Sequence, residues 1–146
     1  MKQPLFKHPI TRALLTWVAF IPIAIINGII REALYKPVVG ELAAHQISTV
    51  IVAGTFILLA YFLLKHSIPM RPTNKLWLIG LLWVVLTITF EMVLGHYVLG
   101  NSWGRVFYDY NLAEGRVWGL LLLTLLITPW LLKGLSSNYH HPQYNR

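Results

Sequence analysis

The chain has 146 residues, of which 56% are hydrophobic and only 12% are charged, and its formal net charge is +7. A soluble domain carries roughly twice this charged fraction, so the composition indicates a membrane protein. The chain has no cysteine, which excludes disulfides, thiolate metal ligands and cysteine nucleophiles.

Four apolar segments are each long enough to cross a bilayer, which takes about 20 helical residues. These predicted spans cover about 13–31, 42–64, 76–99 and 112–132, and a polar C-terminal tail covers 135–146. Basic residues precede the first span as in a signal peptide, but no small-x-small cleavage site follows it, so we interpret it as a retained span. Because the connections are short, we predict a single all-α domain, an antiparallel bundle of four transmembrane helices.

The charges predict the orientation of this bundle. Eight of the twelve basic residues lie before the first span, between the second and third, or after the fourth, and no acid accompanies them. The positive-inside rule therefore places both termini in the cytoplasm, and we predict a bacterial inner membrane. No basic cluster forms a separate domain, which argues against a nucleic-acid partner. The predicted partner is the lipid bilayer.

All five acids consequently fall at the non-cytoplasmic end. Glu91 lies about eight residues inside the end of the third span, or roughly 12 Å along a helix. An ionised carboxylate at that depth is costly unless it is paired or protonated. Asn27 and Arg31, spaced four residues apart, point from the first span toward the same end, and Arg116 enters the fourth span against the helix dipole.

Two acids of this end have ordinary structural interpretations. Asn111 to Glu114 has the spacing of a capping box, which predicts that the fourth helix begins there. Glu41 follows Pro37 in the expected first turn of the second span, where an acid complements the helix dipole.

One functional hypothesis is a metal site. Glu41 and His45 are spaced four residues apart and can reach one ion from a single helix, with Glu91 as a third ligand from the next span. Carboxylate and imidazole without thiolate suit a divalent zinc, iron or manganese ion. A haem between His45 and His96 is a weaker alternative.

A second hypothesis is a metal-free polar pocket. In it, Glu91 and His45 form a catalytic proton-handling pair, while Arg31 and Arg116 bind an anionic headgroup. Asn27 and Asp109 complete the expected ligand-binding set. The leading prediction is a small membrane enzyme or binding protein that acts on a lipid or another apolar molecule.

Two further alternatives stay open. In the first, the charged residues form a buried ion-pair network that fixes the register of a structural or accessory subunit within a larger membrane complex. In the second, Glu91 relays protons or ions in a transporter, which would need a homo-oligomer because four spans are few for a pore. The sequence does not decide between an enzyme and these alternatives.

Overall fold

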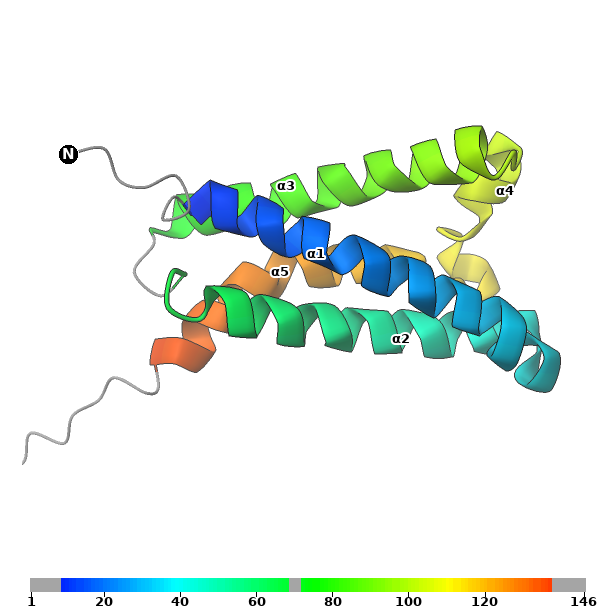
Figure 1. The fold of residues 1–146 in the computed structure, drawn as a ribbon, viewed down its shortest axis with the longest axis horizontal. Helices are drawn as coiled ribbons and strands as arrows, with labels where there is room; N and C mark the ends of the chain where they lie inside the picture. Colours follow the sequence, from blue (N-terminus) through cyan, green and yellow to red (C-terminus); the bar gives the residue numbers. More distant parts are fainter. Residues whose placement is uncertain (1–8, 69–71, 138–146) are drawn as a thin grey trace, which may run out of the picture.

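The computed structural model describes residues 9–68 and 72–137, and within these ranges it is all-helical, without a strand. Four long helices run between two ends of the molecule (Figure 1): α1 (Pro9–Ile30), α2 (Lys36–Leu64), α3 (Thr73–Met92) and α5 (Trp118–Ser137). The shorter elements gather at one end and are listed here: η2 (Arg31–Tyr35), η3 (Val93–Val98), α4 (Trp103–Tyr108) and η4 (Leu112–Glu114). We call this end the acidic end, because the acids of the chain lie at or near it.

The chain reverses its direction between α1 and α2 through a short segment that is mostly helical. A π-helical turn, η2, follows α1 directly, and Gly40 then has φ 80° and ψ 169°, a conformation open almost only to glycine. The two helices consequently lie antiparallel, and the side-chain amide of Asn27 donates to the carbonyl of Ser48 at 3.3 Å. This return places the predicted first and second spans side by side (Figure 1).

The fourth long helix begins later than the sequence predicts. Asn111 does not cap a long helix; its amide donates to the Glu114 carboxylate at 2.9 Å, and the segment between them is the single 3-10 turn η4. Gly115 ends that turn in the left-handed region, at φ 76°, so α5 begins only at Trp118. The predicted start at 112 is therefore wrong by six residues, and Arg116 precedes the helix. The described part of the predicted polar tail at 135–146 ends within α5 at Ser137, and the rest lies outside the described residues.

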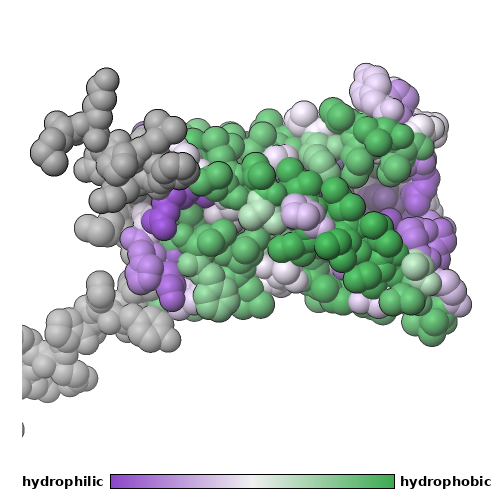
Figure 2. Space-filling model, viewed as in Figure 1, coloured by the Kyte–Doolittle hydropathy of each residue, from purple (hydrophilic) through white to green (hydrophobic). Residues whose placement is uncertain are grey.

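The helices are long and apolar enough to cross a membrane. Within residues 9–68 and 72–137, three continuous helical stretches meet this condition, at Ile10–Leu64, Thr73–Val98 and Trp118–Leu135, and the first covers α1 from its second residue, η2 and α2. Figure 2 shows hydrophobic side chains covering the middle of the molecule and hydrophilic ones gathering toward both ends. Many large apolar side chains are exposed on this middle band, as expected of a surface that contacts lipid.

The buried core lies away from the acidic end and contains three aromatic side chains, Phe20, Phe56 and Trp83, among aliphatic ones. Phe56 packs edge-to-face against both Phe20 and Trp83, with ring centroids 4.8 and 4.9 Å apart. The indole of Trp83 donates to the carbonyl of Ala13 at 2.9 Å, which fixes α1 against α3. Beyond this contact α1 and α3 diverge toward the acidic end (Figure 1).

Candidate functional site

Four charged side chains form an ion-pair cluster at the acidic end: Glu41, Arg105, Asp109 and Arg116. One oxygen of Glu41 lies 2.7 Å from Arg116 and 3.3 Å from Arg105. One oxygen of Asp109 lies 3.1 Å from Arg105 and 3.4 Å from Arg116. The cluster joins the start of α2 to α4 and to the segment before α5, so its charges balance within the protein.

Arg116 is the buried centre of this cluster, with 5% of its surface exposed. Its guanidinium carbon lies 4.5 Å from the ring centroid of Tyr108, a cation–π distance. Burial by itself lowers the pKa of Arg116, but hydrogen bonding to Glu41 and Tyr108 and the charges of Asp109 and Glu41 raise it overall. Arg116 is thus a cation that is already paired within the protein, and the anion clamp that it would form with Arg31 stays a prediction.

His45 lies directly beneath the ion-pair cluster and is 1% exposed. Its Nδ1 is 3.9 Å from an oxygen of Asp109, and its ring centroid is 6.2 Å from that of Trp118. Within the described part of the chain, neither ring nitrogen has a hydrogen-bond partner. A buried polar group without a partner is costly, which marks His45 as a residue that the packing alone does not explain.

Glu91 is held by two neutral donors. The indole nitrogen of Trp118 donates to one carboxylate oxygen at 2.5 Å, and the hydroxyl of Tyr110 donates to the other. Among the ion pairs of the described residues, none includes Glu91. Burial, together with the Glu91 carboxylate, raises the pKa of Tyr110, so its phenol stays protonated and keeps donating.

A cavity of about 950 Å³ lies between α1 and α3 and reaches Glu91. We call it the α1–α3 groove. Its sides are apolar and aromatic, whereas Arg31, Glu32, Lys36, Arg105 and Asp109 line its polar mouth at the acidic end. The rim is open on the apolar band: Ile25 and Ile29 line the groove and are 41% and 62% exposed. A hydrophobic molecule could therefore enter from the side.

The predicted metal ligands do not converge. Glu41 pairs with Arg105 and Arg116, while Glu91 bonds to Tyr110 and Trp118. Across residues 9–68 and 72–137, no group of three His, Asp or Glu side chains is placed to hold a metal ion. The geometry therefore does not support the predicted zinc, iron or manganese site.

The other predicted residues have specific surroundings. Arg31 pairs with Glu32 at 3.2 Å at the mouth of the groove, and Asn27 bonds the backbone of α2 rather than facing the groove. The Nδ1 of His96 lies 2.8 Å from the carbonyl of Asn101, and its ring stacks on Trp103 with centroids 4.0 Å apart. These contacts give the predicted haem pair of His45 and His96 no support.

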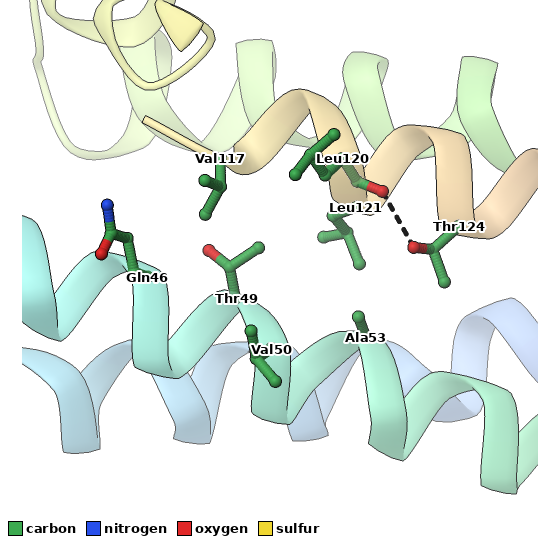
Figure 3. A pocket seen from close by; sticks show the side chains of 8 residues that line it. All are labelled: Gln46, Thr49, Val50, Ala53, Val117, Leu120, Leu121 and Thr124. Atoms are coloured by element: carbon green, nitrogen blue, oxygen red, sulfur yellow. Dashed lines mark hydrogen bonds between the residues drawn. The ribbon is translucent and has the colours of Figure 1, made fainter. Parts of the chain in front are cut away.

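A second, smaller cavity of about 380 Å³ lies between α2 and α5 (Figure 3). Its threonine hydroxyls are satisfied within their own helices, because Thr49 donates to the His45 carbonyl and Thr124 to the Leu120 carbonyl, both at 2.8 Å. Gln46 donates to the carbonyl of Gly115. This cavity therefore offers few free polar groups and is a poorer candidate site than the α1–α3 groove.

No family model matches this chain, and no curated protein or solved structure matches it. The function therefore has to be argued from the site itself.

Sequence reasoning missed three residues of the site. Arg105 and Asp109 have the four-residue spacing of a helical ion pair, so Arg105 had a detectable signal. Tyr110 and Trp118 had none, because their bonds to Glu91 depend on how the segment between α4 and α5 folds back over α3.

Proposed function

We propose that the protein crosses the membrane four times, through α1, α2, α3 and α5, with both termini in the cytoplasm of a bacterial cell. Among the described residues, four basic ones and no acid lie at the end opposite the acidic end, which supports this orientation. The tight reversal around Gly40 supports counting the stretch Ile10–Leu64 as two crossings. On this topology the α1–α3 groove lies in the outer half of the bilayer.

We propose further that the α1–α3 groove binds a lipid-like amphipathic molecule, with its apolar part between the helices and its polar part toward the acidic end. The observation that carries this proposal is the division of the groove into an apolar body and a charged mouth. Its volume falls within the range of ligand sites, about 300–1,000 Å³. The exposure of Ile25 and Ile29 on its rim provides a path from the bilayer.

The same groove would serve an enzyme or a binding protein. Glu91 is the acid–base group for an enzyme, because it lines the groove and has no basic partner among the described residues. His45 does not line the groove and would act on a ligand only through Asp109, which does. Binding is therefore the activity to test first.

The experiment is native mass spectrometry of protein purified in a mild detergent, which counts bound lipid-like molecules. Gly28 lines the groove, and a Cβ added there meets nothing within 4 Å, so we expect Gly28→Leu to extend into open space. Gly54 has equally open surroundings but does not line the groove. We expect Gly28→Leu to lose the bound molecule and Gly54→Leu to keep it; equal occupancy in both variants would contradict the proposal.

A structural or accessory role is the second candidate, and the ion-pair cluster is the observation that favours it. The cluster ties three separate parts of the chain together and leaves no charge of its own unbalanced. Such a network fixes register rather than performing chemistry. Protein that carries no bound molecule, and in which Gly28→Leu changes only stability, would favour this role.

A further inference from the structure

We propose that the ligand of the α1–α3 groove is an apolar organic cation, such as a hydrophobic amine or quaternary ion, and that Glu91 is its counter-ion. This inference rests on the proposed binding function and names the class of ligand. It follows from the hydrogen bonds of Glu91, the pairing of the other charges at the groove and the side chains that line it.

The hydrogen bonds of Glu91 leave its charge uncompensated. Both carboxyl oxygens accept a hydrogen bond, one from Trp118 and one from Tyr110, as an ionised acid can. Both donors are neutral, so they orient the carboxylate without balancing it. A carboxylate has about four acceptor sites, and the two that remain are available to a ligand.

The basic residues of the groove are already engaged. Arg31 and Lys36 both pair with Glu32, at 3.2 and 2.9 Å. Arg105 belongs to the ion-pair cluster and contacts Glu41 and Asp109. Among the acids of the described residues that line the groove, Glu91 is therefore the one without a basic partner, and a cation from outside the protein would complete the pair.

The walls of the groove suit a cation that is also hydrophobic. Five aromatic side chains line it: Trp17, Phe20, Phe90, Tyr110 and Trp118. Aromatic rings attract cations through their negative faces, and the attraction grows when the cation is stripped of water. A small hydrated ion would lose more hydration free energy in this apolar space than its attraction to one carboxylate would restore. An apolar cation has little hydration to lose.

Two probes of one shape and opposite charge test the inference: tetraphenylphosphonium and tetraphenylborate, measured by equilibrium dialysis against the full chain in detergent. We expect the phosphonium to bind and the borate neither to bind nor to compete. Glu91→Gln should weaken phosphonium binding by about tenfold or more, because it removes one partner of a desolvated charge pair. Glu114→Gln, which makes the same charge change outside the groove, should leave binding unchanged.

Several results would overturn the inference. Equal affinity for the two probes would mean that shape alone is recognised, and unchanged phosphonium binding in Glu91→Gln would remove Glu91 as the counter-ion. If Glu91→Gln does not fold, the binding of the two probes to the unmodified chain and to Gly28→Leu tests the inference instead. If Gly28→Leu loses a bound lipid-like molecule but the unmodified chain does not bind the phosphonium, the proposed binding function stands. Only the proposal that the ligand is a cation is then refuted.

Discussion

Arg116 is buried and Glu91 is half-buried, and the fold surrounds these two side chains with different kinds of partner. Arg116 lies among two carboxylates and an aromatic ring, so its charge is balanced within the protein. Glu91 accepts hydrogen bonds from a phenol and an indole, which orient it without neutralising it. Because a balanced charge can be structural whereas an unbalanced one calls for a ligand or a proton, only Glu91 is a candidate for function.

The role assigned to Arg116 predicts a loss of stability when its charge is removed. Arg116→Gln leaves Glu41 and Asp109 with one cation fewer, and because Glu41 is 47% exposed we expect a loss of about 1–3 kcal/mol, below that of a fully buried pair. Arg105→Gln is the matched control: its side chain is 41% exposed, so its loss should stay below about 1 kcal/mol. Unfolding in detergent, followed by circular dichroism, measures both. A larger effect at Arg105 would contradict the structural role of Arg116.

At the scale of helices, the two faces of α3 are packed very differently. On one face Gly80 lets α3 approach the backbone of α5 so closely that an added Cβ would lie 2.3 Å from the carbonyl oxygen of Leu126. On the other face α3 diverges from α1 and leaves the groove (Figure 1). Small residues allow close packing of helices in membranes, where water does not drive them together. α3 therefore stays against α5, through Gly80 and through the bond from Trp118 to Glu91, while the side of α3 near Glu91 that faces α1 stays open.

The close contact predicts that even one methyl group at residue 80 is harmful. Gly80→Ala forces α3 and α5 apart, and overpacking of this kind costs about 1–3 kcal/mol. Gly54→Ala is the control, because a Cβ there meets nothing within 4 Å and alanine favours a helix over glycine by roughly 0.5–1 kcal/mol. Thermal unfolding in detergent should separate the two variants. Equal stability would mean that α3 and α5 do not pack through Gly80.

For the molecule as a whole, charge is divided between the two ends. Among the described residues, the acids lie at or near the acidic end together with Arg31, Lys36, Arg105 and Arg116, whereas Arg12, Lys65, Lys75 and Lys133 lie at the opposite end. An apolar band separates the two ends (Figure 2). This division has the form expected of a membrane protein whose basic end faces the cytoplasm.

The absence of cysteine allows the orientation to be tested with single introduced thiols. Ala113, in η4, and Asn74, at the start of α3, are both exposed and lie at opposite ends of the molecule. We expect an impermeant maleimide to label Ala113→Cys in intact cells and Asn74→Cys only after permeabilisation. The reverse pattern would invert the protein and place the mouth of the groove on the cytoplasmic side.

The sequence by itself determined the all-helical class with helices long and apolar enough to cross a membrane, because apolar length and the scarcity of charge depend on composition along the chain and not on packing. It also determined that Glu91 is unusual, since an acid inside an apolar run is costly in any arrangement of the helices. The helix ends were less predictable: the start of α5 depends on the left-handed Gly115, which overrides the expected cap at Asn111.

The partners of the charged residues were decided only by the tertiary structure. Glu41 and His45 share a helical spacing with metal ligands, yet Glu41 pairs with Arg105 and Arg116 across the bundle. Helical periodicity fixes which residues share a face of one helix, but it does not say which residues of another helix come opposite that face. The groove has the same origin, because it exists only where α1 and α3 diverge while α3 stays packed against α5.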